Sequence, residues 1–161
     1  PAPQKKPTRV GTLFSSAADA HDALPRDKQA RIAKLRAIHQ GAGRRAPTGT
    51  GQEDQALRYQ QPSVVHPVVR THPHTGRKCL YVLKGECEGI EGVPKDEALA
   101  LIDELAEHTI DPRFRHVHHW RVGDLLMWDN CAVQHLASHD YQWPKHRRVM
   151  HRITVGPAGT A

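Results

Sequence analysis

One histidine and two arginines near the C-terminus could together bind a metal ion beside a small acid. His135 lies seven residues after Trp128, and Arg148 and Arg152 follow in a basic run. A neutral imidazole is a good ligand for a first-row metal, and the planar guanidinium group makes bidentate hydrogen bonds to carboxylates that lysine cannot match. This combination suits a metal ion next to a bound dicarboxylate.

The stretch before His135 predicts how this side chain is held. Gly123 and Asp124 are typical of a turn, and residues 125–128 (Leu-Leu-Met-Trp) are typical of a buried strand. His135 should therefore lie at the start of the next element. From the residues alone, such a histidine is more often a satisfied core residue than a ligand, and Trp128 is explained equally well as a core aromatic.

The two arginines are predicted to return on a further strand and to share one of its faces. Arg148 and Arg152 are four residues apart, and side chains alternate between the two faces of a strand. Both would therefore point the same way and could hold two different anions. Arg147 would point the other way, toward solvent or a partner.

Five segments spread along the chain form a shared pattern. They are residues 11–14 (Gly-Thr-Leu-Phe), 66–73 (His-Pro-Val-Val-Arg-Thr-His-Pro), 75–78 (Thr-Gly-Arg-Lys), 128–135 (Trp-Asp-Asn and the histidine five residues after the asparagine) and 147–156. In this order they resemble the taurine dioxygenase / 2,4-dichlorophenoxyacetate dioxygenase family of iron(II), 2-oxoglutarate-dependent oxygenases. The resemblance runs over nearly the whole chain.

The resemblance implies a role for each of five residues. His135 would bind Fe(II), while Thr12 and Arg148 would bind the distal carboxylate of the cosubstrate 2-oxoglutarate. Trp128 would form a wall of the cofactor pocket, and Arg152 would meet the acid group of the substrate. Without the resemblance, Thr12 is more simply explained as a strand or turn threonine.

The resemblance also implies a reaction and an incomplete metal site. In the family, iron is held by two histidines and a carboxylate, and the first two ligands come from a His-x-Asp/Glu motif upstream of the Gly-Thr-Leu-Phe segment. No such motif precedes Thr12. We therefore expect the chain to be the C-terminal part of an oxygenase, carrying one iron ligand of three.

The implied activity is hydroxylation of a small acidic organic substrate (a sulfonate, sulfate ester or carboxylate) with release of succinate and CO2. Two alternatives remain open. One is a catalytically inactive remnant of the fold that binds a small anion. The other is an unrelated basic binding module.

The remaining sequence predicts a mainly β domain with flanking helices. Helices are expected at 17–24, at 26–39 with Ile32, Leu35 and Ile38 on one face, and from 95 onward with Leu99, Ile102 and Leu105 on one face; strands are expected at 64–69, 78–83 and 114–122. Short strands joined by turns, with helices to cover a sheet, predict part of a double-stranded β-helix, or jelly roll. We expect one partial domain over residues 1–161, incomplete at its N-terminus. Residues 1–10 would be a flexible lead-in, and residues 41–61 a long loop with a composition typical of disorder; long loops over such sites often act as lids.

Two further groups of histidines are predicted to be structural. His72 and His74 lie in a Pro- and Gly-containing stretch that is typical of a surface turn. His116 and His118 alternate along a strand and should share a face with Trp120. A surface turn is favoured over a metal site for the first group, and hydrogen bonds to neighbours are favoured over a metal cluster for the second.

Composition restricts the kinds of ligand, compartment and partner that the chain is expected to have. The net charge is +6, but the lysines and arginines are scattered, which favours small anionic ligands over nucleic acid. No apolar run approaches the length of a membrane span. Three cysteines without paired spacing argue for a reducing, cytoplasmic compartment. If early strands are missing, the open sheet edge favours association, including homo-oligomers.

Overall fold

The computed structural model describes residues 11–40, 62–137 and 149–156. The predicted lead-in at 1–10, the predicted loop at 41–61 and Arg148 lie outside the described residues. No helix in the described ranges is long and apolar enough to cross a membrane.

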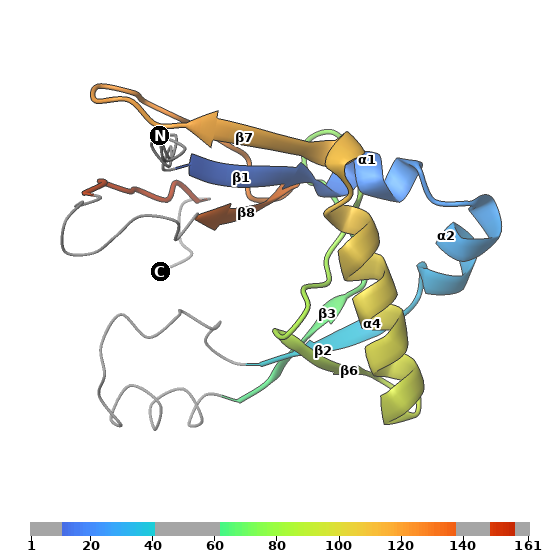
Figure 1. The fold of residues 1–161 in the computed structure, drawn as a ribbon. Helices are drawn as coiled ribbons and strands as arrows, with labels where there is room; N and C mark the ends of the chain where they lie inside the picture. Colours follow the sequence, from blue (N-terminus) through green and yellow to red (C-terminus); the bar gives the residue numbers. More distant parts are fainter. Residues whose placement is uncertain (1–10, 41–61, 138–148, 157–161) are drawn as a thin grey trace, which may run out of the picture.

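Groups of short strands are separated by helices along the described chain (Figure 1). In order, they are β1 (Gly11–Ser16), α1 (Ala17–Asp22), α2 (Arg26–Ile32), β2 (Arg36–His39), β3 (Val64–Pro67), β4 (Val69–Thr71), β5 (Lys78–Leu80), β6 (Cys87–Ile90), α4 (Lys95–Thr109), the 3-10 helix η1 (Pro112–Phe114), β7 (Arg115–His119) and β8 (Val133–Ala137). Within the described ranges, the strands form three small sheets with the orders β7-β1-β8, β3-β2-β6 and β4-β5. The mainly β class with flanking helices is as predicted.

The longest helix, α4, begins where the sequence predicts. Pro94 precedes it, and Asp96 and Glu97 lie in its first turn, near the positive end of the helix dipole. Ile102 and Leu105 are buried, as predicted, and Leu99 packs against the same core at its edge. The buried face also includes Ala98, Leu101, Ala106 and Thr109, at helical spacing.

The main hydrophobic core lies around α4 and the sheet β3-β2-β6. Its buried residues come from α1, α2, β2, β5, β6, α4 and the connections next to α1, β4 and β5: Ala20, Leu24, Ile32, Ala37, Val68, Leu80, Val82, Cys87, Ile90, Ala98, Leu101, Ile102 and Leu105. Figure 1 shows α4 running along one side of the molecule, from beside β6 to the end of the sheet β7-β1-β8. The helix therefore connects the core to the strands that carry the predicted site.

The predicted helix over 26–39 is wrong in its second half. The helix ends at Ile32, and Arg36–His39 forms the central strand of the sheet β3-β2-β6. Ala37 and His39 are buried while Arg36 is exposed, which is the alternation of a strand. Over so few residues helical and strand periods cannot be separated, and pairing with two neighbouring strands decides the outcome.

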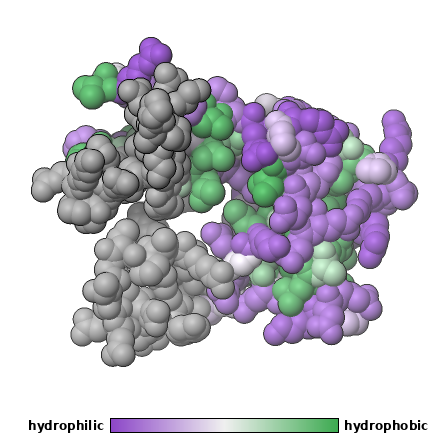
Figure 2. Space-filling model, viewed as in Figure 1, coloured by the Kyte–Doolittle hydropathy of each residue, from purple (hydrophilic) through white to green (hydrophobic). Residues whose placement is uncertain are grey.

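The predicted buried strand at 125–128 is also wrong. These residues follow the predicted turn at Gly123, whose φ of 90° suits glycine, but they form no strand. The side chains of Leu125 and Met127 are 97% and 92% exposed. No described strand lies beside them to pair with their backbone. Figure 2 shows hydrophobic surface at the exposed tip of the connection that follows β7.

The predicted strand carrying the second arginine is not formed in the described residues. Residues 149–156 have no strand hydrogen bonding, and Val149, Ile153 and Val155 are largely exposed. The physical reason is the same as for 125–128, because an apolar strand is stable only when neighbours cover it.

Candidate functional site

The sheet β7-β1-β8 places several predicted site residues on one face. Phe14 of β1 is paired with His135 on β8 and with His116 on β7. Thr12 is paired with His118 on β7. Directly paired residues on antiparallel strands point to the same face, so all five side chains share it. His116 and His118 lie on one face, as their spacing predicts.

His135 lies against two aromatic rings. Its ring centroid is 5.1 Å from that of Trp128 and 6.2 Å from that of Phe14, and the two aromatic rings are 5.3 Å apart. Burial against these rings lowers the pKa of His135 from its ordinary 6.5, and the positive charge of Arg152 lowers it further. The imidazole is therefore neutral at neutral pH, which is the form that binds a metal.

Arg152 lies over the predicted pocket wall. Its guanidinium carbon is 6.0 Å from the centre of the Trp128 ring. The structure thus brings His135, Trp128 and Arg152 together, with Thr12 on the same face of the sheet. Arg148 belongs to the range that the structure does not describe.

Thr12 has a partner that sequence reasoning missed. Its side chain is almost fully buried, and the indole N–H of Trp120 donates to its hydroxyl oxygen at 2.8 Å. Trp120 in turn stacks edge-on with His118, whose Nε2 lies 3.1 Å from a carboxylate oxygen of Asp124. The strand alternation identified the shared face, but nothing local to Trp120 indicated a partner 108 residues away.

The predicted surface turn at His72–Gly76 is formed, but one of its histidines is buried. His74 is exposed, whereas His72 is buried and its Nε2 lies 2.7 Å from Oδ2 of Asp129. The hydrogen bond from His72, together with the backbone N–H of Cys131, holds the pKa of Asp129 below its usual 3.8. Asp129 is therefore an ionised acceptor engaged with His72.

The described residues supply one imidazole toward a metal site and do not complete it. Within the described ranges, no group of three or more His, Cys, Asp or Glu side chains could hold a metal ion. Asp129 is bound by His72, and His118 lies at hydrogen-bonding distance from Asp124. A facial iron site needs two further ligands beside His135, so no reaction step through iron follows from these residues.

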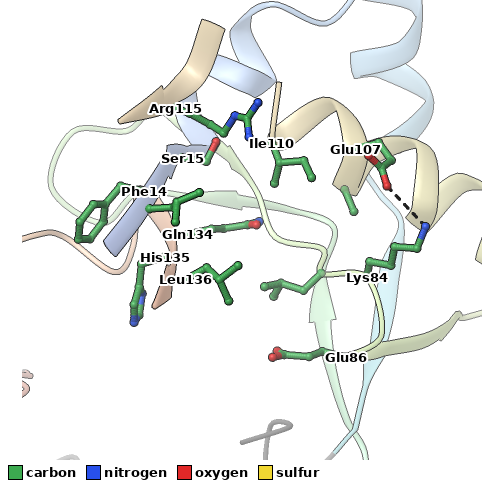
Figure 3. Close-up of a pocket in the computed structure, with 13 residues that line it drawn as sticks. Phe14, Ser15, Lys84, Glu86, Glu107, Ile110, Arg115, Gln134, His135 and Leu136 are labelled. Carbon is green, nitrogen blue, oxygen red and sulfur yellow. Dashed lines mark ion pairs between the residues drawn. The ribbon is translucent and has the colours of Figure 1, made fainter. Parts of the chain in front are cut away.

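A cavity of about 380 Å³ lies on the opposite face of the same sheet. Figure 3 shows Ser15, Gln134 and Arg115 on the side of Ile110 and α4, whereas the rings of Phe14 and His135 extend away. The space is mostly apolar, and Lys84 at its edge is already paired with Asp103 and Glu107. Phe14 and His135 are among the residues that line this cavity, although their rings extend away from Ile110.

Comparison with known proteins identifies the relatives of this chain. Residues 11–154 match the family described as "Taurine catabolism dioxygenase TauD, TfdA family". The chain is 40% identical, over 129 residues, to the alpha-ketoglutarate-dependent 2,4-dichlorophenoxyacetate dioxygenase of Cupriavidus pinatubonensis, covering 80% of this chain and 45% of that protein.

Two solved structures share the fold. A taurine dioxygenase from Burkholderia xenovorans superposes with a TM-score of 0.69 and 30% identity, covering 84% of this chain and 44% of the other. The protein AAD-2, in complex with Mn(II) and N-oxalylglycine, superposes with a TM-score of 0.68 and 32% identity, covering 82% and 51%. The chain thus spans about half the length of the relatives it matches.

Proposed function

The chain belongs to the TauD/TfdA family of dioxygenases, and from this we propose that it supplies part of the active site of an Fe(II)- and 2-oxoglutarate-dependent dioxygenase. The overall reaction would hydroxylate a small acidic organic substrate and release succinate and CO2. The observation that carries the proposal is the grouping of the His135 imidazole, the Trp128 ring and the Arg152 guanidinium beside β1.

Each residue has one role in this proposal. His135 is the metal ligand that this chain contributes, and Trp128 is the wall beside it. Thr12 and Arg148 bind the distal carboxylate of 2-oxoglutarate through a hydroxyl and a bidentate guanidinium. Arg152 meets the acid group of the substrate, whether sulfonate, sulfate ester or carboxylate.

The proposal extends to the surroundings of the site. The strands would belong to one jelly-roll domain, with the sheet β7-β1-β8 forming part of its wall. A net charge of +6 with scattered basic residues supports small anions as ligands rather than nucleic acid. The three free cysteines support a reducing compartment such as the cytoplasm.

A second candidate is an anion-binding remnant without catalysis. It is supported by the single imidazole that the described residues bring to the metal site. This candidate predicts that a dicarboxylate binds to the basic residues while no succinate forms.

Paired arginine variants test the proposed roles in the protein that carries this chain. Arg148→Ala should raise the 2-oxoglutarate requirement about ten- to a hundredfold, because a charge-assisted contact of about 1.5–3 kcal/mol is lost, and substrate affinity should change little. Arg152→Ala should weaken the binding of an acidic substrate. The formation of succinate without substrate turnover should stay largely intact. Loss of 2-oxoglutarate binding in Arg152→Ala would mean that the roles are swapped. No change in either variant would refute the proposal for this basic segment.

Iron titration of the 161-residue chain tests the metal assignment. A single imidazole cannot supply a three-ligand face, so we expect Fe(II) binding weaker than about micromolar, and His135→Ala should weaken it further. Tight stoichiometric binding that disappears in His135→Ala would show that other residues of this chain complete the site.

A further inference from the structure

A buried histidine far from the basic run holds the acidic residue of the Trp-Asp-Asn segment. His72 is 6% exposed, and its Nδ1 accepts the backbone N–H groups of His74 and Thr75 at 3.2 and 3.1 Å. Because Nδ1 is an acceptor, the ring proton lies on Nε2 and is donated to Oδ2 of Asp129 at 2.7 Å. The tautomer of His72 is therefore determined by its own turn.

Asp129 uses its other acceptor atoms to build the turn that leads into β8. Its Oδ1 accepts the N–H of Cys131 at 2.7 Å, and its backbone carbonyl accepts the N–H groups of Ala132 and Val133 at 3.2 and 3.1 Å. Val133 is the first residue of the strand that carries His135. Both carboxylate oxygens are thus engaged, one with this turn and one with His72.

The indole N–H of Trp128 donates to Oδ1 of Asn130, two residues away, at 2.8 Å, and this local bond does not fix the segment to the rest of the chain. Leu125 and Met127 are almost fully exposed, and residues 125–128 form no strand. The Trp128 ring nevertheless lies 5.1 Å from the ring of His135. The adjacent Asp129 side chain connects this segment to a buried group on another part of the chain.

His72 and its turn are bound by hydrogen bonds to the rest of the described chain. The backbone N–H of His72 donates to the carbonyl of Arg77 at 2.8 Å, and Gly76, with φ of 71°, closes the turn. The Arg77 guanidinium then binds Asp19 and Asp22 of α1 at 2.7 and 2.6 Å. A continuous set of polar contacts therefore runs from α1 through the turn to Asp129.

We propose that His72 is a positioning residue that, through Asp129, holds the Trp128 ring against the His135 imidazole. The purpose of this arrangement, a fixed wall beside a metal ligand, rests on the proposed function. The arrangement itself concerns contacts within this chain, so it can be tested whether or not the chain supports catalysis.

Nuclear Overhauser contacts between the rings of Trp128 and His135 provide the measurement. In Asp129→Ala these contacts should be lost or strongly weakened, because the tether is removed. Asp129→Asn should lie in between, since an amide has one acceptor oxygen where the carboxylate uses two. His72→Phe, which keeps a ring without the donor, should behave like Asp129→Ala.

Two controls separate positioning from a general loss of stability. His74→Gln changes an exposed histidine of the same turn and should leave the ring contacts intact. Leu101→Ala removes core packing in α4 away from the tether, so its folded molecules should also keep them. Asp129→Ala should lower the folded-to-unfolded ratio by up to about tenfold, at the low end for a bond to a charged group because Asp129 is half exposed.

Unchanged Trp128–His135 contacts in a folded Asp129→Ala protein would overturn the proposal, even if His72→Phe fails to fold. Loss of the contacts in Leu101→Ala as well would also overturn it, because the effect would then be general. If contacts depend on the tether but no succinate forms in the unsubstituted protein, the proposed function fails and the positioning role stands.

Discussion

Around α4 the described chain is held by apolar contacts, whereas the sheet that carries His135 is joined to it mainly by polar side chains. Within the described ranges, the main core contains no residue of β1, β7 or β8. Instead, the Ser15 hydroxyl donates to the backbone carbonyl of Thr109 at the end of α4, and the Gln134 amide donates to the carbonyl of Val82 at 3.1 Å. A second, smaller apolar cluster is contributed by α1 and β5.

Because of this difference, the stability of the fold and the position of the His135 sheet depend on different regions. Burial of apolar surface stabilises without regard to direction, while a hydrogen bond constrains the orientation of both partners. The core around α4 should therefore determine whether the chain folds, and the polar contacts should determine where the sheet with His135 lies. Substitutions in the two regions should have different and separable effects.

The largest effect is expected in the core. Leu105→Ala removes a fully buried side chain from α4 and should lower the free energy of unfolding by about 2–5 kcal/mol, measured by urea denaturation. Leu125→Ala is the matched control at a 97% exposed position and should change the value by less than about 0.5 kcal/mol. Equal decreases in the free energy of unfolding in the two variants would contradict the division between the regions.

An intermediate effect is expected where the sheet meets α4. Ser15→Ala removes the hydroxyl that donates to the buried carbonyl of Thr109. It should lower the free energy of unfolding by about 1–3 kcal/mol. Hydrogen exchange should accelerate in β1 more than in α4, because the bond joins the sheet to an already stable helix. Ser63→Ala, which removes an exposed hydroxyl bound to Glu88, should have little effect on either measurement. Uniform acceleration in both elements would argue against a separate attachment.

The smallest effect is expected from the ion pairs between α1 and the His72–Gly76 turn. Hydrogen bonds from Arg77 lower the pKa of Asp19 and of Asp22 below their usual 3.8. A carboxyl whose pKa is lower in the folded state contributes stability that is complete above its unfolded pKa and is lost as the pH falls through its folded pKa. The free energy of unfolding should therefore fall below about pH 4, and Arg77→Gln should make this dependence shallower.

The matched control for this pH experiment is Lys78→Gln, because Lys78 binds the Thr71 hydroxyl and pairs with no carboxylate within the described ranges. Its acid dependence should match that of the unsubstituted chain. Because Arg77 and both aspartates are about half exposed, solvent screens the pairs and the difference should be small. If the free energy of unfolding of Arg77→Gln falls with pH as steeply as that of the unsubstituted chain, these pairs do not contribute to acid sensitivity.

Local patterns in the sequence determined several features correctly. Pro94, the acids after it and apolar residues at helical spacing were sufficient to predict α4, because a helix satisfies its backbone within one segment. Strand alternation was sufficient to place His116 and His118 on one face. The family segments also led to the prediction of His135, Trp128 and Arg152 as site residues; the structure brings these three side chains together, and their roles stay predictions.

Other features depended on residues far away along the chain and were decided only by the tertiary structure. Residues 36–39 became a strand because β3 and β6 lie on either side, while 125–128 and 149–156 remained unpaired where no described strand adjoins them. The His72–Asp129 bond joins residues 57 positions apart, and neither residue has a local signal for the other. A sheet or a tether needs a partner that local sequence does not specify, so the contacts that hold Trp128 and His135 in place follow from the fold alone.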